Sequence, residues 1–242
     1  MQEKVKIRVT PNQYVKGTLI VPNNLKEKRP AFIFIHGWAS SEKGYIQRAK
    51  AAIENQAIAL TLNLRGHGLS DGKLEEFSRA DHLADIIATY KFLIKQPYVD
   101  KHKIGLVGSS YGGYLATIAT SKLSINYLAL RAPALYQDKN FHIPTAELNK
   151  TDERVYRQQN LKANDNLALK ALSHYKGHLL LIESEKDQVC PHATLQNYLK
   201  NTHPQTKVNH QIIRGAKHIL DVKSNQVFIQ ILSQWIKEVI NF

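Results

Sequence analysis

The sequence is poor in cysteine, with Cys190 as the only one among its 242 residues. A single thiol excludes a disulfide within the chain and a cysteine-built metal cluster. The sequence also lacks an apolar signal core near its start, and apolar stretches such as residues 31–35 are too short to cross a membrane. We therefore expect a cytoplasmic protein with no transmembrane segment.

Blocks of like charge are also missing, although the formal net charge is +13. The lysines are spread along the chain, and no recognised nucleic-acid-binding motif is present. A basic, solvated surface explains this distribution. We therefore expect no nucleic-acid partner.

Internal repeats, low-complexity tracts and linkers rich in proline, glycine or serine are absent as well. Hydrophobic residues make up 43% of the chain and charged residues 22%, which is ordinary for a globular protein. The length suits one large domain with a sizeable core. We predict a single domain over residues 1–242.

What the sequence does contain is an alternation of apolar strands and helices. Strands are predicted at residues 5–9, 15–21, 31–35, 58–64, 104–109, 127–131, 179–183 and 208–213. Helices are predicted at residues 42–55, 78–96, 111–122, 192–201 and 224–240, with Ser78 as an N-cap. Near-continuous apolar strands separated by helices indicate an α/β fold, with a mostly parallel sheet covered on both faces.

One connection is too long for this alternation. Residues 133–175 separate two strands where a short loop and one helix would suffice, and they include a predicted helix at residues 151–159. The segment is polar and carries three aromatic residues: Tyr136, Phe141 and Tyr156. Long connections are often lids or binding loops, so we predict a lid here; a surface insertion without function is the alternative.

The most informative motif is Gly108-Ser109-Ser110-Tyr111-Gly112-Gly113, which joins a predicted strand to a predicted helix. A G-x-S-x-G pattern in this context is typical of a nucleophile elbow, a tight turn that exposes a serine hydroxyl. Glycine two residues before and after the serine removes a collision between strand and helix. Ser110 is the predicted nucleophile, and Ser109 takes the variable position.

A serine nucleophile needs a histidine base and a group that orients the base. His218 follows the last predicted strand, so it should lie at the carboxyl end of that strand. Asp187 follows the preceding strand, and Glu185 in the same loop is the competing carboxylate. We favour Asp187 over Glu185 as the acid.

The order Ser110, Asp187, His218 is that of α/β-hydrolases. The sequence resembles this family over nearly its whole length, through five motifs in the right order. They are His36-Gly37-Trp38, the segment at residues 63–72, the elbow at residues 108–113, Lys186-Asp187-Gln188-Val189-Cys190-Pro191 and Gly215-Ala216-Lys217-His218. The segment at residues 63–72 has asparagine where the family has aspartate. Within the family, the sequence is most similar to bacterial carboxylesterases and cinnamoyl (feruloyl) esterases.

The resemblance implies an α/β-hydrolase fold and cleavage of a carboxylic ester through an acyl-enzyme, with Ser110 as nucleophile, His218 as base and Asp187 as its orienting acid. It assigns the oxyanion hole to the backbone N–H groups of Trp38 and Tyr111. It implies no metal or other cofactor. Four neighbouring residues are expected to shape loops rather than contact substrate: His36, Gly37, Arg65 and His67.

Other functions are compatible with the same sequence. Thioesters and acyl-peptide or other amide bonds suit the same chemistry, and a binding protein with this fold but no activity is possible. A phosphate-binding turn is excluded because neither glycine-rich phosphate motif occurs near residues 105–113. A haloalkane-type hydrolase is excluded because the elbow carries a serine, not a carboxylate. The substrate's acyl and leaving groups and the oligomeric state are left open.

Overall fold

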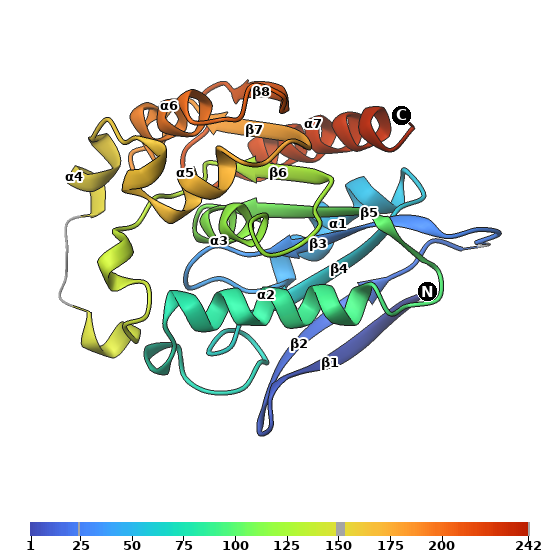
Figure 1. Ribbon diagram of the computed structural model, residues 1–242. Helices are drawn as coiled ribbons and strands as arrows, with labels where there is room; N and C mark the ends of the chain where they lie inside the picture. Colours follow the sequence, from blue (N-terminus) through green and yellow to red (C-terminus); the bar gives the residue numbers. More distant parts are fainter. Residues whose placement is uncertain (24, 149–152, 242) are drawn as a thin grey trace.

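A computed structural model describes residues 1–23, 25–148 and 153–241 of the chain. These residues form one eight-stranded sheet, with the strands in the order β1-β2-β4-β3-β5-β6-β7-β8 (Figure 1). β1 and β2 pair antiparallel, β2 joins β4 antiparallel, and every other neighbouring pair is parallel. The strands are β1 (Gln2–Thr10), β2 (Gln13–Ile20), β3 (Arg29–Ile35), β4 (Ile58–Asn63), β5 (Val99–Ser109), β6 (Tyr127–Arg131), β7 (His178–Ser184) and β8 (Lys207–Ile213).

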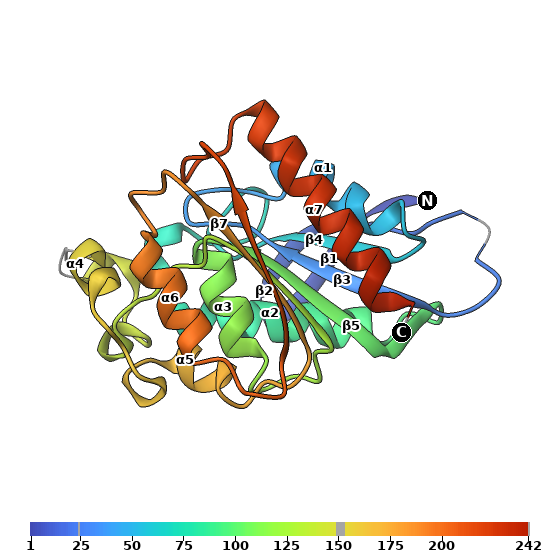
Figure 2. The same ribbon diagram turned by 90° about the horizontal axis from the view of Figure 1, so that it is seen from above.

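Helices cover both faces of this sheet (Figures 1 and 2). On one face lie α1 (Lys43–Ile53) and α7 (Val222–Ile240), which pack against each other. On the other lie α2 (Arg79–Leu93), α3 (Tyr111–Ala119), α5 (Leu167–Leu172) and α6 (His192–Lys200). None of the described helices is both long and apolar enough to cross a membrane.

The central strand β3 shows why the sheet is buried on both sides. Phe32 and Phe34 point into the cluster under α1 and α7, whereas Ile33 and Ile35 point into the cluster under α2 and α3. All four side chains are fully buried. Because side chains alternate along a strand, a continuous apolar run can serve two cores at once. The predicted α/β class, with a mostly parallel sheet between helices, is confirmed.

Some predicted boundaries differ from the structure. The helix predicted at residues 78–96 is α2, capped by the Ser78 hydroxyl, which accepts a hydrogen bond from the Asp81 N–H at 3.2 Å. It ends at Leu93, because Lys95 and Gln96 donate to carbonyls three residues back and so continue as turns. Similarly, α3 ends at Ala119 rather than at residue 122, and β5 begins at Val99 rather than at residue 104.

The long connection, residues 133–175, which we call the cap segment, runs between β6 and β7. It contains α4 (Glu153–Gln158), short 3₁₀ helices at Asp138–Asn140, Thr145–Glu147 and Ala163–Asp165, and α5. Of the helix predicted at residues 151–159, residues 151 and 152 lie outside the described part. Helix α5 was not predicted; its buried Leu169 and Leu172 pack into the core beside α3. Because the cap segment begins just after β6, its first part lies at the same end of the molecule as the carboxyl ends of the parallel strands (Figure 1).

Candidate active site

Ser110 lies in the sharp turn between β5 and α3. Its backbone has φ 51° and ψ −116°, a conformation that side-chain-bearing residues rarely adopt. A Cβ atom on Gly108 would collide with the Gly112 carbonyl, and one on Gly112 would collide with the carbonyls of Ile35 and His36. The two glycines therefore allow the helix to cross close over the strand, which leaves the Ser110 hydroxyl at the end of β5.

Ser110, His218 and Asp187 form a hydrogen-bonded chain. His218 Nε2 lies 3.0 Å from Ser110 Oγ, and His218 Nδ1 lies 2.7 Å from Asp187 Oδ2. The other Asp187 oxygen accepts the backbone N–H groups of Val189 and Cys190, both at 2.8 Å. With an acceptor-only carboxylate at Nδ1, the neutral ring keeps its proton there, and Nε2 can accept the serine proton.

The loops that carry Asp187 and His218 are tied together. The Lys186 N–H donates to the Ala216 carbonyl at 2.8 Å, so the loop after β7 lies against the loop after β8. Glu185, the competing carboxylate in the sequence, points elsewhere. It pairs with Arg214 at 2.6 Å and accepts the Gly215 N–H at 2.7 Å. The structure therefore brings Asp187, and not Glu185, to His218.

Arg131, at the end of β6, also supports the histidine. Its Nη1 donates to the His218 carbonyl at 2.6 Å. The side chain is buried, and its Nε has no hydrogen-bond partner among the described residues. Burial lowers the pKa of this guanidinium. Arg131 was not predicted as a site residue, although its position at the carboxyl end of a parallel strand was an available signal.

Two backbone N–H groups lie close to Ser110: that of Trp38, on the loop after β3, and that of Tyr111, the first residue of α3. A Cβ atom built on Gly37 would lie 3.7 Å from Ser110 Cβ, so the loop after β3 reaches the nucleophile. Within the described ranges, neither N–H donates to another protein group. Two unpaired donors beside a nucleophile are what an oxyanion hole requires. The Trp38 and Tyr111 rings meet edge to face, with centroids 5.0 Å apart.

Two buried histidines, His36 and His82, lie next to Trp38 and Tyr111. The Tyr111 hydroxyl donates to His82 Nδ1 at 2.7 Å, while His82 Nε2–H donates to the Arg65 carbonyl at 2.9 Å. His36 Nε2 accepts the Leu64 N–H at 3.0 Å. Burial lowers the pKa of His36 to about 4 and that of His82 to about 3. Both rings are therefore neutral near pH 7. Their hydrogen bonds connect the residues 64–65 segment to the loop after β3 and to the start of α3.

Arg65 and His67, expected to hold a turn, do so in the structure. Arg65 Nε lies 2.6 Å from Asp85 Oδ1, and both side chains are buried. The His67 N–H donates to the Leu64 carbonyl at 3.0 Å, which closes the turn. The loops around residues 36 and 65 are therefore a braced unit next to the nucleophile.

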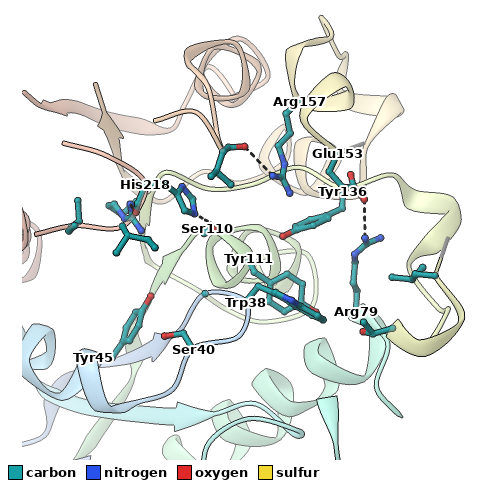
Figure 3. Close-up of a pocket in the computed structure, with 18 of the residues that line it drawn as sticks. Trp38, Ser40, Tyr45, Arg79, Ser110, Tyr111, Tyr136, Glu153, Arg157 and His218 are labelled. Carbon is teal, nitrogen blue, oxygen red and sulfur yellow. Dashed lines mark hydrogen bonds and ion pairs between the residues drawn. The ribbon is translucent and has the colours of Figure 1, made fainter. Parts of the chain in front are cut away.

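A cavity of about 870 Å³ opens over Ser110 and His218 (Figure 3). Its walls come from the loop after β3, α1, the first turn of α2, the loop that carries His218, and the cap segment. The charged side chains that line it, besides His218, are Arg48, Arg79, Arg131, Glu153 and Arg157. These residues were not predicted from the sequence, because they lie far apart in the chain and no local motif marks them.

The described residues contain no group of three or more histidine, cysteine, aspartate or glutamate side chains arranged to hold a metal ion. The chemistry available at this site is that of a serine, a histidine and a carboxylate, with two backbone donors beside them. Such an arrangement can transfer an acyl group to and from the serine hydroxyl.

Comparison with known proteins places the chain in a family. Residues 47–242 match the prolyl oligopeptidase family. Inactive dipeptidyl peptidase 10 of Rattus norvegicus is 24% identical over 195 residues, which are 77% of this chain and 23% of that protein. A 31.7 kDa protein of Escherichia coli from the traX-finO intergenic region is 33% identical over 111 residues, 44% of this chain and 38% of that protein. This chain thus matches less than two fifths of either curated relative.

Among solved structures, Est1E of Butyrivibrio proteoclasticus with bound ferulic acid is similar to this chain. The TM-score is 0.77 at 20% sequence identity, covering 98% of this chain and 100% of that one. At this level of identity the likeness concerns the fold. The expected α/β-hydrolase fold is confirmed.

Proposed function

The chain belongs to the prolyl oligopeptidase family of serine hydrolases, and from this premise we propose that it cleaves carboxylic esters through an acyl-enzyme intermediate. The observation that carries the proposal is the hydrogen-bonded chain from Ser110 through His218 to Asp187. It opens onto a cavity large enough for a small organic ester.

In the proposed reaction, Ser110 Oγ attacks the ester carbonyl while His218 Nε2 takes the hydroxyl proton. His218 then passes that proton to the leaving alcohol, and a water molecule cleaves the acyl-serine by the same route. Asp187 holds the His218 ring in the required tautomer and stabilises the imidazolium that forms. Arg131 acts as a positioning residue, because its hydrogen bond to the His218 carbonyl fixes the loop that carries the base.

The backbone N–H groups of Trp38 and Tyr111 are assigned to stabilise the negative charge that develops on the carbonyl oxygen of the substrate. Each donor of this kind contributes about 3 kcal/mol to the transition state in known hydrolases. The hydrogen bond from Tyr111 to His82 and the packing of Trp38 on Tyr111 support this geometry, since they hold the start of α3 and the loop after β3 together before substrate binds.

We propose that the cap segment forms a lid over this site and sets the choice of acyl group. Its residues Tyr136, Ile143 and Leu148 line the cavity, whereas α5 packs into the core. The overhanging part would then be the portion before α5. All the residues assigned to the chemical step lie outside the cap segment.

Two alternatives remain as candidates. A thioester or an amide could be cleaved by the same groups, and the family's name favours a peptide bond. A binding role without catalysis is favoured by the relative that is named inactive. The intact hydrogen-bonded chain of Ser110, His218 and Asp187 argues against a purely binding role, because a protein without activity does not need that alignment.

The test is a panel of substrates given to the purified protein. It should contain p-nitrophenyl esters of increasing acyl length, hydroxycinnamate esters, acyl-CoA thioesters and aminoacyl p-nitroanilides. The proposal predicts turnover of short esters, with a burst of p-nitrophenol that approaches the enzyme concentration for any ester whose acyl-enzyme is hydrolysed more slowly than it forms. Turnover of the anilides alone would contradict ester hydrolysis and favour a peptidase.

A further inference from the structure

The charged groups around the cavity are unbalanced. Four arginines line it, Arg48, Arg79, Arg131 and Arg157, against one carboxylate, Glu153. Arg131 and Arg157 are each only 5% exposed, and neither forms an ion pair with a carboxylate in the described ranges. Burying a guanidinium without a directly paired carboxylate is costly. An anion that entered the cavity would offset that cost.

Two of the arginines and the carboxylate form one wall. This acyl-side wall consists of Arg79, Tyr136, Glu153 and Arg157. The guanidinium carbon of Arg79 lies 4.4 Å from the centre of the Tyr136 ring, and that of Arg157 lies 4.8 Å from it. Arg157 donates from Nε to the Leu135 carbonyl at 3.1 Å and from Nη1 to the Val189 carbonyl at 3.0 Å. These two bonds fix the guanidinium and leave its other N–H groups available.

Glu153 only partly neutralises this wall. Its Oε1 lies 3.3 Å from Arg79 Nη2, longer than a strong charge-assisted hydrogen bond, and its Oε2 has no partner among the described residues. Burial raises the pKa of the Glu153 carboxyl. Two guanidinium groups, those of Arg79 and Arg157, stand against this one carboxylate, so the four residues of the wall together carry a net positive charge.

The wall lies on the far side of Ser110 from His218, as Figure 3 shows. His218 delivers a proton to the leaving group in the proposed mechanism, so the leaving group lies on the histidine side. The acyl group must then extend away from His218, toward Tyr136, Arg79 and Arg157. Any anion that the wall binds is thus part of the acyl group.

We propose that the acyl-side wall binds a carboxylate at the far end of the acyl group, so that the preferred substrate is the half ester of a dicarboxylic acid. The inference rests on the proposed ester hydrolysis. Ser110 Oγ forms the acyl bond as the alcohol departs with the proton from His218, and water then releases the dicarboxylate. Arg79 and Arg157 hold the free carboxylate throughout, which sets the length of chain that reaches Ser110.

The experiment compares three ethyl esters of similar length, which differ in the end of the acyl group. Ethyl hexanoate is neutral, monoethyl adipate carries a carboxylate, and ethyl 6-aminohexanoate carries an ammonium group. The readout is the ratio of kcat/KM for the adipate ester to kcat/KM for the hexanoate ester. The wild-type ratio should be about ten or more, because a charge-assisted hydrogen bond to a fixed guanidinium favours the anion.

Single substitutions in the wall should move this ratio in opposite directions. Arg79→Gln and Arg157→Gln should each lower it about tenfold, and Arg157→Lys should lower it less because the charge is kept. Glu153→Gln should raise it, since the competing carboxylate is gone. Arg8→Gln removes the same charge from the exposed edge strand β1, outside the cavity, and should leave the ratio unchanged.

A second measurement tests the anion site without turnover. Adipate should bind to the Ser110→Ala protein in calorimetry, more weakly at high salt, and binding should be lost in the Ser110→Ala, Arg157→Gln double variant. If none of the three esters is cleaved but adipate binds in this way, ester hydrolysis fails and the anion site stands.

Three results would overturn the inference and leave ester hydrolysis standing. The hexanoate ester could be cleaved at least as fast as the adipate ester. The 6-aminohexanoate ester could be preferred, which would make Glu153 the recognition group. The ratio could also stay constant in both arginine variants, in which case the arginines serve only the fold.

Discussion

The loops at the carboxyl ends of the parallel strands, called the carboxyl edge below, differ from the cap segment in how their polar groups are hydrogen-bonded. At the edge, Asp187 and His218 are each held by hydrogen bonds of 3.0 Å or less to neighbours that are themselves fixed. In the cap segment, Glu153 has an unpartnered oxygen and a long contact of 3.3 Å to Arg79. The side chains of Ser110, His218 and Asp187 are thus paired with one another before a ligand binds, whereas in the cap segment a buried carboxylate oxygen is left without a partner among the described residues.

The difference follows from what each region must do. Groups that take part in the chemical step must be in position before substrate arrives, so they are built on strand ends and braced by backbone bonds. Groups that recognise substrate gain their partner only on binding, and the unbalanced charge of the wall is then neutralised. We therefore expect substitutions at the carboxyl edge to lower kcat for every substrate. Substitutions in the cap segment should instead alter the choice among substrates.

The largest effect is expected from Ser110→Ala. It removes the nucleophile and should lower kcat for a short activated ester by about a million-fold, because the covalent route is lost. Ser109→Ala is the matched control and should keep most of the activity. The measurement is turnover of a p-nitrophenyl ester by both proteins, and an exchange of the two results would mean that the nucleophile has been misplaced.

Asp187→Asn should have the next largest effect. The amide can no longer hold the His218 ring with its proton on Nδ1, so kcat should fall by about ten-thousand-fold while the protein stays folded. Glu185→Gln changes the exposed neighbour that pairs with Arg214, and should have little effect on kcat. A severe loss for Glu185→Gln with near-normal Asp187→Asn would break the assignment of the acid.

Replacing the overhanging part of the cap segment should change preference by about tenfold without removing the chemistry. A short glycine-containing connection in place of residues 138–160 would remove Glu153 and Arg157 but keep Tyr136 and α5. The protein should still react with a small organophosphate, and the ratios of kcat/KM among acyl groups should change. An unchanged order of preference would make the segment a passive insertion. Loss of organophosphate reactivity in a folded protein would mean that it supports the triad directly.

The two regions also differ in how well they can be predicted from the sequence, and the catalytic residues are the more predictable. The elbow is a local pattern, because the glycines beside Ser110 are needed within one turn, and their spacing survives in the sequence. Asp187 and His218 follow predicted strands, so their convergence on one edge follows from parallel topology. The strand order, with β3 between β4 and β5, depends on long-range pairing and was not predicted.

Tyr136 was noted in the sequence as an aromatic residue of the predicted lid, but the charged residues of the acyl-side wall left no local signal. Arg79 looks like an exposed residue in the first turn of a helix, and Arg157 lies on a helix of six residues, too short for periodicity to reveal a buried face. The same limit hid α5, whose six residues Leu167–Leu172 are mostly buried against α3. Only the packing of distant segments makes a cavity out of these residues.

The smallest effect is expected from Tyr111→Phe. The backbone N–H assigned to the oxyanion hole is kept, so kcat should fall only a few-fold. However, the substitution leaves His82 Nδ1 buried without its donor, which should lower the free energy of unfolding by about 1–3 kcal/mol. Denaturant unfolding and ester turnover of the same variant separate the two roles. A thousand-fold loss of kcat with unchanged stability would mean that the hydroxyl itself acts on the substrate.

The presence of an activated serine is tested most directly by labelling with a fluorophosphonate, followed by mass spectrometry of the peptides. The reagent reacts with a serine only when a base and an oxyanion site are in place. We expect stoichiometric labelling at Ser110, abolished in Ser110→Ala and retained in Ser109→Ala. A folded protein that takes up no label, as a catalytically silent binding protein would, or a label on Ser109, would contradict the proposed mechanism.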